Sequence, residues 1–321
     1  MRVVLTGGGG FIGSYVLARM IGAGIDVTLV GPNTGKSRYT ASLVAAGEAR
    51  FVHCDESFRD YGVLRSALAD ADALVLLGYV MPTTASPADR LLEEFDRNVE
   101  PTLRLLRAAG DRVRQIVFAS SVSVYGIPTR MPVGESDALS PRTPYAIGKV
   151  ACEQALQLQS AASGARCGIL RYSTVYGPGE LVPRAIPNFI RAALAWQMPR
   201  IRGDGLDEHD YVHVTDVADA TLTALRRKTQ GVFNIATGLG TTTSDLAQLV
   251  YKLAGATAVP VFELSAEPAR ARVRLVCDTE RARAQLGFIA RRPLAEGISE
   301  EIGWFRSRLG TGTPPAGRRA A

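Results

Sequence analysis

A glycine-rich turn near the start of the chain constrains the fold more than any other feature. Residues 2–6 (RVVLT) predict a buried strand, and a helix with apolar periodicity follows to about Ile21. Between them lie Gly7, Gly10 and Gly13, each three residues apart. In such a strand–turn–helix unit these glycines permit a tight turn, close approach of a pyrophosphate, and close packing of helix on strand. We therefore expect a dinucleotide here, held partly by free N–H groups of the first helical turn, at Phe11 and Ile12.

Strands and helices alternate along the first half of the chain. Apolar strands are predicted at 26–31, 50–54, 73–78, 114–119 and 166–171, with helices at 62–69, 88–109 and 144–163. Most of these strands are continuously apolar, which indicates a parallel sheet covered on both faces. With right-handed crossovers, this pattern predicts an α/β fold built on a Rossmann doubly wound parallel sheet.

Beyond Gly177-Pro178-Gly179 the regular alternation weakens. A helix is predicted at 184–196, a strand and a helix within 210–228, a strand at 231–235 and a helix at 243–254. We divide the chain into a dinucleotide-binding Rossmann domain (1–178), a smaller, mixed α/β C-terminal substrate domain (179–308) and a disordered tail (309–321). Some segments within about 210–236 are candidates for packing back on the Rossmann domain.

Composition argues against several classes of protein. The 321 residues are 46% hydrophobic and 21% charged, as in a globular protein in water. No apolar run reaches the roughly 20 residues that span a bilayer, and no leader pattern opens the chain, so we expect a cytoplasmic protein without membrane contact. The four cysteines and three histidines lack disulfide or metal-ligand spacing, so no metal is expected.

The formal charge of +6 raises the question of nucleic-acid binding. Many of the arginines, however, lie in helix-like stretches and towards the C-terminus, among alanines and acids rather than stacking aromatic residues. A solvated surface is therefore favoured, with a pocket for an anionic substrate as the alternative. We do not expect nucleic acid as a partner.

The end of the second predicted strand bears on the choice of cofactor. An acidic residue at this point of a Rossmann unit usually binds the adenosine ribose diol, but this chain has Gly31. No carboxylate is therefore in place to repel a 2′-phosphate, and Asn33, Lys36 and Arg38 follow closely as possible contacts. The pattern slightly favours NADP over NAD. The alternative is that the loop is solvated and NAD binds without that carboxylate.

A tyrosine and a lysine stand four residues apart in Tyr145-Ala-Ile-Gly-Lys149. On the predicted helix this spacing places both side chains on one face. The ammonium of Lys149 favours the phenolate form of Tyr145, and Lys149 can also bind the nicotinamide ribose. Tyr145 can then exchange a proton with a substrate hydroxyl or carbonyl while hydride moves to or from the nicotinamide.

Together these motifs resemble the extended short-chain dehydrogenase/reductase family, over nearly the whole chain to about residue 305. The turn matches TGGxGFIG, YxxxK follows, and residues 120–126 (SSVSVYG) resemble SSxxVYG. The resemblance implies that Ser121 polarises the reacting oxygen, with Ser123 beside the substrate, and that Asp55 contacts the adenine unless it is only a loop acid. It also implies that Asn98 braces strand and helix, and that a homodimer forms through helices near 88–109 and 144–163.

The predicted substrate region departs from the family pattern. Residues 170–178 look like LRxxNVYGP with Thr174 in place of the Asn, and residues 203–214 resemble GDGxxxRDYVHV with His209 in place of the Arg. A neutral histidine supplies less charge than a guanidinium to a pyrophosphate. Arg270 lies near the place of the family's RxGD arginine, but the Gly-Asp is missing. Residues 233–238 (FNIATG) match a motif that we expect to be structural.

The leading hypothesis is an NAD(P)-dependent epimerase or ketoreductase acting at a sugar carbon, with a nucleotide sugar as the expected substrate. Val122 and Ser123 occupy the positions of the acid and base of the family's dehydratases, which argues against a dehydratase. Thr174 and His209 keep a second hypothesis open, a reductase of a non-nucleotide carbonyl. A non-catalytic dinucleotide sensor fits poorly, because Ser121, Tyr145 and Lys149 are all present.

Overall fold

The computed structural model describes residues 1–35, 37–81, 87–256, 260–263 and 272–309. Its centre is a seven-stranded sheet in the order β10-β6-β5-β4-β1-β2-β3, in which every neighbouring pair is parallel. The strands are β1 (Arg2–Thr6), β2 (Asp26–Gly31), β3 (Arg50–His53), β4 (Ala73–Leu76), β5 (Gln115–Ser121), β6 (Arg166–Tyr172) and β10 (Gly231–Ile235). This sheet confirms the predicted Rossmann fold. The strand order reverses between β1 and β4, where doubly wound sheets bind their ligands.

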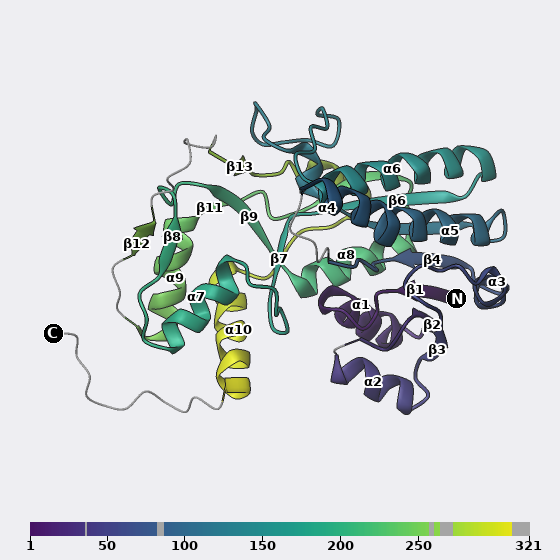
Figure 1. The fold of residues 1–321 in the computed structure, drawn as a ribbon, viewed down its shortest axis with the longest axis horizontal. Coiled ribbons are helices and arrows are strands. Elements are labelled where there is room, and N and C mark those ends of the chain that lie inside the picture. The colour runs from purple at the N-terminus through teal and green to yellow at the C-terminus, as the bar shows by residue number, and fades with distance from the viewer. Residues whose placement is uncertain (36, 82–86, 257–259, 264–271, 310–321) are drawn as a thin grey trace.

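Helices cover both faces of the sheet (Figure 1). Val3 and Leu5 of β1 point into one core layer with α1 (Phe11–Gly22) and α8 (Val214–Arg226). Val4, between them, points into the other layer with α3 (Tyr61–Leu68), α5 (Glu100–Ala109) and α6 (Pro144–Ser163). Alternate residues of a strand face opposite sides of the sheet, so a strand buried on both sides is apolar throughout.

The predicted helix over 88–109 is interrupted. It consists of α4 (Pro87–Glu94), a π turn, η1 (Phe95–Val99), and α5. Pro101 supplies the physical reason, because it has no N–H to donate and its ring crowds the carbonyl of residue 97. The prediction of one regular helix is therefore wrong at this point, and the irregular turn lies beside the functional site.

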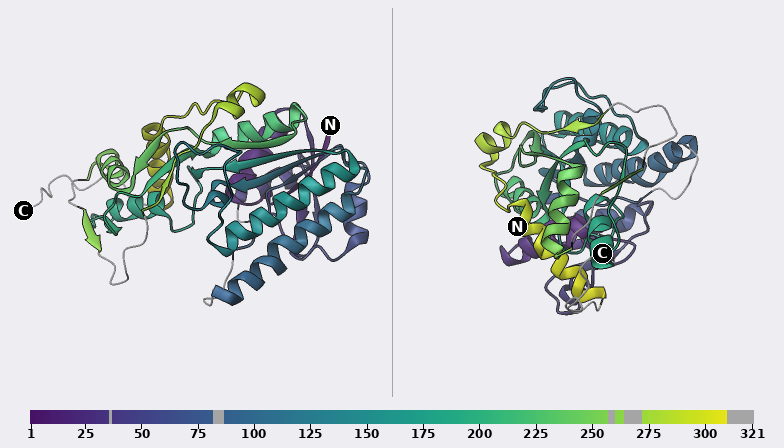
Figure 2. Two further views of the ribbon diagram at one scale, coloured as in Figure 1. Left: turned by 90° about the horizontal axis from the view of Figure 1, so that it is seen from above. Right: turned by 90° about the vertical axis from the view of Figure 1, so that its left-hand side faces the viewer.

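The C-terminal region forms a smaller body at one end of the sheet (Figure 2). One sheet joins β7 (Thr174–Tyr176), β9 (Glu208–His213), β11 (Gly240–Thr242) and β13 (Arg274–Leu275), and a second pairs β8 (Arg200–Arg202) with β12 (Val261–Glu263). The helices α7 (Ala185–Leu194), α9 (Thr243–Ala254) and α10 (Leu294–Leu309) enclose a separate apolar cluster. The strands β7, β8, β11, β12 and β13 were not predicted, because two or three residues carry no periodicity. The helices α2 (Arg38–Ala45) and α10 were also missed.

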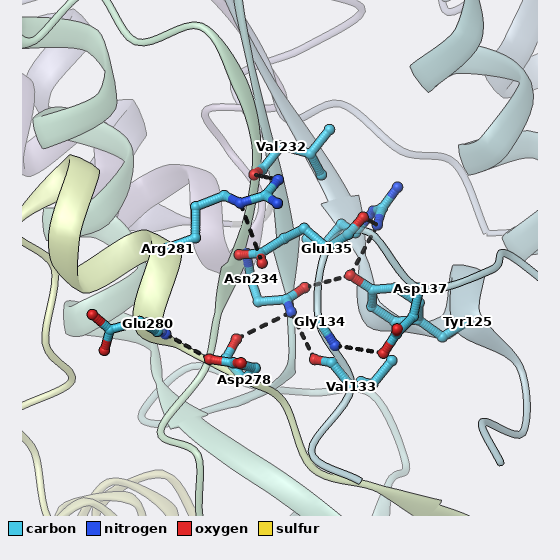
Figure 3. Close-up of polar contacts among 11 residues, drawn as sticks. Tyr125, Val133, Gly134, Glu135, Asp137, Val232, Asn234, Asp278, Glu280 and Arg281 are labelled. Carbon is cyan, nitrogen blue, oxygen red and sulfur yellow. Dashed lines mark hydrogen bonds and ion pairs between the residues drawn. The ribbon is translucent and has the colours of Figure 1, made fainter. Parts of the chain in front are cut away.

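Asn234 of β10 ties the C-terminal region to the main sheet (Figure 3). Its Nδ2 donates to the carbonyls of Val133 at 3.0 Å and Asp278 at 3.1 Å, and its Oδ1 accepts from the Tyr125 hydroxyl at 2.8 Å. Three segments distant in sequence therefore meet at one buried amide, which supports the expected structural role of the FNIATG motif. Within the described ranges, no helix is long and apolar enough to cross a membrane.

Candidate active site

The glycine turn joins β1 to α1 at the carboxyl edge of the sheet. Gly7 has a φ of +72°, and a Cβ there would lie 2.6 Å from the amide nitrogen of Gly78 after β4. A Cβ on Gly13 would lie 2.0 Å from the carbonyl oxygen of Gly7. A Cβ on Gly10 would meet only that same oxygen, at 3.3 Å. Gly7 and Gly13 are thus required by packing, whereas Gly10 mainly leaves the backbone open to a ligand.

A further glycine contact was missed from the sequence. A Cβ on Gly9 would lie 1.8 Å from the carbonyl oxygen of Thr34, and a Cβ on Gly35 would lie 2.3 Å from the carbonyl oxygen of Gly9. The Thr40 hydroxyl also donates to the Gly8 carbonyl at 3.0 Å. The segment between β2 and α2 therefore packs directly on the turn. A run of four glycines, longer than the motif needs, is the signal that could have revealed it.

A large cavity of about 1090 Å³ opens above the turn. Ligand pockets commonly measure about 300–1,000 Å³, so this one has room for a dinucleotide. Of the predicted cofactor residues, Gly7, Gly10, Phe11, Asn33 and Arg38 line it, whereas Ile12, Gly13, Asp55, Tyr145 and Lys149 do not. The wall is completed by the ends of β2 and β4, by Trp304 and Arg308 of α10, and by Pro178, Gly179, Leu181 and Val182. Predicted residue Lys36 lies outside the described residues.

The end of this cavity next to β2 holds few free carboxylates. Asp55 is exposed and absent from the lining, and hydrogen bonds from Ser57 lower the pKa of its carboxyl. Glu56 does line the cavity but pairs with Arg97 at 2.7 Å. Arg38, by contrast, has no acidic partner among the residues that the structure describes. This end is consequently more favourable for an anionic group than a Rossmann site with an acid after the second strand.

Tyr145 and Lys149 occupy the first turns of α6, which Thr143 caps through a hydrogen bond from the Ala146 amide. The Lys149 ammonium is buried and donates to the Ala119 carbonyl of β5 at 2.8 Å. It lies 5.7 Å from the centre of the Tyr145 ring. The predicted pair is therefore brought together at the carboxyl end of β5, with a fixed ammonium available to a phenolate.

Ser121 ends β5, and its hydroxyl accepts from the Ser123 amide at 3.2 Å, capping the short helix η2 (Val122–Tyr125). Val122 is buried, and the buried hydroxyl of Ser123 has no hydrogen-bond partner within the described part of the chain. Neither side chain is an acid or base that could remove or deliver a proton.

A buried ion pair stabilises the carboxyl end of β5. Arg171 of β6 donates to both carboxylate oxygens of Glu153, at 3.1 and 2.7 Å, and to the Tyr125 hydroxyl at 2.8 Å. Ser120 also donates to Glu153. Because both partners are satisfied by several hydrogen bonds, the pair fixes β5 and β6 where Ser121 leaves the sheet.

The predicted substrate residues lie on β7 and β9. Thr174 and His209 are half-buried, and the His209 ring is 6.3 Å from that of Tyr211. Next to His209, the Asp210 carboxylate accepts from the amides of Thr237 and Gly238 at 2.9 and 2.8 Å, which locks β9 to the end of the FNIATG motif. Arg270 lies outside the described residues. Two other arginines, Arg200 and Arg272, pair with Glu263 and Asp204.

Tyr79 is the functional residue that sequence reasoning missed. It follows β4, its ring lines the large cavity, and that ring packs edge-on against Tyr145 with centres 4.9 Å apart. Nothing in the local sequence signals this contact, which depends on how the segment after β4 folds. Tyr79 therefore forms the wall between the cofactor cavity and the Tyr145–Lys149 pair.

This fold and site define a Rossmann-fold enzyme that uses a nicotinamide dinucleotide, with a tyrosine–lysine pair at the carboxyl end of the sheet. The chain belongs to the NAD dependent epimerase/dehydratase family, whose model matches residues 3–236.

Several proteins of this kind are similar over their whole length. A UDP-glucose 4-epimerase of Mycolicibacterium smegmatis is 34% identical over 96% of this chain and 99% of its own. The crystal structure of a UDP-glucose 4-epimerase of Thermotoga maritima with UDP-glucose has a TM-score of 0.82 at 28% identity, covering 96% and 100% of the two chains. That of a UDP-glucose-4-epimerase of Stenotrophomonas maltophila, with bound NAD and formylated UDP-arabinopyranose, has a TM-score of 0.84 at 26% identity, covering 97% and 100%.

Proposed function

We propose that the protein is an NAD(P)-dependent epimerase of a nucleotide-activated sugar, with Tyr145 as its acid–base residue. The observation that carries the proposal is the Tyr145–Lys149 pair, held at the end of β5 beside a cavity that opens on the glycine turn. The names of the similar proteins support the substrate class, because two of them were solved with uridine diphosphate sugars.

The residues of the chain have distinct tasks in this reaction. When bound, the cofactor supplies the hydride acceptor, and the glycine turn offers it a backbone without Cβ atoms at Gly10. Tyr145 as phenolate takes the proton of the sugar hydroxyl while Lys149 stabilises its charge. Ser121 hydrogen-bonds the reacting oxygen. Epimerisation then requires a hydride to return to the opposite face of the carbonyl carbon while Tyr145 gives the proton back to the oxygen.

A ketoreductase is the second candidate, and the end of the cavity next to β2 favours it. Reductases use NADPH as hydride donor. Its 2′-phosphate suits Gly31 in place of an acid, together with Arg38, which pairs with no acid among the described residues. We infer that the site binds NADP at least as well as NAD. Thr174 and His209 similarly favour a carbonyl substrate that lacks a nucleotide, whereas Val122 and Ser123 do not suit a dehydratase.

The proposed quaternary state is a homodimer through α4, α5 and α6. Four of the exposed large apolar residues lie on these elements or on the π turn between them, namely Leu92, Phe95, Leu103 and Leu158. Exposed apolar side chains that share one surface favour a protein partner.

All four cysteines are buried free thiols, which suits the reducing cytoplasm.

The decisive experiment combines ligand screening with turnover. Thermal-shift measurements with UDP, dTDP and GDP identify the nucleotide, since a ligand at 100 times its Kd adds about 2.7 kcal/mol of stability. The matching sugars are then tested for epimerisation, with Tyr145→Phe as the control that retains cofactor binding. Stabilisation by none of the nucleotides would favour the non-nucleotide reductase, and full activity of Tyr145→Phe would refute the mechanism.

A further inference from the structure

A buried carboxylate lies directly behind the Tyr145–Lys149 pair. Glu94, the last residue of α4, is 1% exposed. Its Oε2 accepts from the Tyr79 hydroxyl at 2.8 Å and from the Asn98 amide at 3.2 Å. Burying a carboxylate is costly unless its charge is compensated, so this position requires an explanation beyond chain packing.

The helix that carries the catalytic pair makes room for this carboxylate. A Cβ on Gly148, within Tyr145-Ala-Ile-Gly-Lys149, would lie 2.4 Å from Glu94 Oε1. Between the two elements is a cavity of about 10 Å³, lined by Tyr79, Glu94, Gly148 and Lys149 among others. This is close to the minimum volume that holds one water molecule. Glu94 is therefore placed to share a small polar space with the Lys149 ammonium.

Tyr79 links the carboxylate to the reacting tyrosine. Its hydroxyl is bound to Glu94, while its ring meets the Tyr145 ring edge-on at an interplanar angle of 84°. The Lys149 ammonium lies 5.3 Å from the centre of the Tyr79 ring. A movement or a change of charge at Glu94 would therefore reach Tyr145 along two routes, through the Tyr79 ring and through Lys149.

We propose that Glu94 is a positioning residue for Tyr145, holding the Tyr79 ring against it and balancing the charge of Lys149. The proposal rests on the proposed role of Tyr145 as acid–base residue. Ionised Glu94 competes with a Tyr145 phenolate for the same ammonium. A purely structural Glu94 would only anchor the segment after β4, through Asn98 and Val80.

The sign of the effect follows from the groups around Glu94. Burial raises the pKa of Glu94, while the Tyr79 hydroxyl, Lys149 and Asn98 lower it. The titratable groups that face it are Tyr79, Glu93, Lys149 and Cys152, and Tyr79 in turn faces Tyr145. Removing the negative charge leaves Lys149 free to stabilise the phenolate. Activity that requires the phenolate should therefore persist to lower pH.

The test is the pH dependence of kcat for sugar oxidation in Glu94→Gln. The amide still accepts from Tyr79 but carries no charge, so the acid limb should move to lower pH by at least about one unit, the effect of a unit charge roughly 12 Å away at an effective dielectric constant of about 20. Tyr79→Phe removes a hydrogen bond that favours ionised Glu94. The acid limb of the Tyr79→Phe variant should therefore move to lower pH as well, but by less than that of Glu94→Gln. Glu100→Gln, which removes a carboxylate paired with Arg104 on α5, should leave the limb unchanged.

A second readout separates this proposal from the proposed function. The absorbance of tyrosinate is followed as a function of pH in the wild-type and Glu94→Gln proteins, each with and without Tyr145→Phe. In each background, the difference between the two curves gives the ionisation of Tyr145 without turnover. A lower midpoint in the Glu94→Gln background supports the proposal even if no sugar reacts. An unchanged midpoint, or a kcat that falls equally at every pH, would overturn it and leave Glu94 a structural residue.

Discussion

Replacing Gly31 with Asp is the sharpest test of how the site selects its cofactor. Gly31 ends β2 at the edge of the cavity. A Cβ built there has the carbonyl oxygen of Asn33 as its nearest neighbour, at 4.0 Å, so a side chain fits without displacing the backbone. Gly31→Asp therefore adds a carboxylate where the adenosine ribose is expected, and any change in affinity reflects that carboxylate rather than misfolding.

The size of the effect follows from two interactions. A ribose hydroxyl of NAD that donates to the new carboxylate gains about 1.5–3 kcal/mol. The 2′-phosphate of NADP instead meets a like charge, and each pair of unit charges about 4 Å apart costs roughly 1 kcal/mol in water and roughly 4 kcal/mol at an effective dielectric constant of 20. Together these change the ratio of NADP to NAD affinity by at least about 2.5 kcal/mol, or roughly 60-fold.

The assay measures the Kd of NAD and of NADP by calorimetry for the wild type, Gly31→Asp and Gly31→Asn. The asparagine variant has nearly the same shape without the charge, so it should retain most of the wild-type ratio. A ratio that changes less than threefold in Gly31→Asp would show that the ribose lies elsewhere. Equal changes in both variants would show that shape, not charge, selects the cofactor.

Four further outcomes are expected. Arg38→Ala should weaken NADP about tenfold and NAD less than twofold, the loss of one charge-assisted contact, measured in the same calorimetric series. Gly13→Ala should lower the free energy of unfolding in urea by more than about 2 kcal/mol, because its Cβ would lie 2.0 Å from a carbonyl oxygen. Asn234→Ala removes three buried hydrogen bonds and should cost about 2–4 kcal/mol in the same assay. Burial raises the pKa of Glu301 to about 9, so the folded state prefers the neutral form of this side chain. The free energy of unfolding should therefore fall as pH rises from about 4.5 to 9. Glu301→Gln should abolish part of that fall, measured by urea titrations at about pH 5 and 8.

The fold of the first half was predictable because its signals are local. The bounds of β1, β2 and α6 agree with the sequence prediction, since an apolar run between turn residues, or a capped periodic helix, defines its own ends. The C-terminal region was less predictable. Strands such as β8 and β13 have three and two residues, and only their partners β12 and β9 make them strands.

The candidate site likewise contains residues that could be predicted from the sequence and residues that could not. Tyr145 and Lys149 were found because their spacing within one helix fixes their relation. The contact of Gly9 with Gly35, and that of Tyr79 with Tyr145, join segments whose approach depends on loops. No spacing rule relates such residues.

The irregular helix shows why the contacts of Glu94 also escaped the sequence pattern. A π turn contains one more residue than the α-helical path, so the helical segment before the turn is rotated by about 100° relative to the segment after it. Glu94 lies on the first of these segments and Pro101 on the second. In one regular helix over 88–109, Glu94 would point away from Tyr79 and Gly148 if α5 kept its packing. Pro101 thus influences the site indirectly, because the π turn that accommodates this proline also directs the Glu94 carboxylate towards Tyr79 and Gly148.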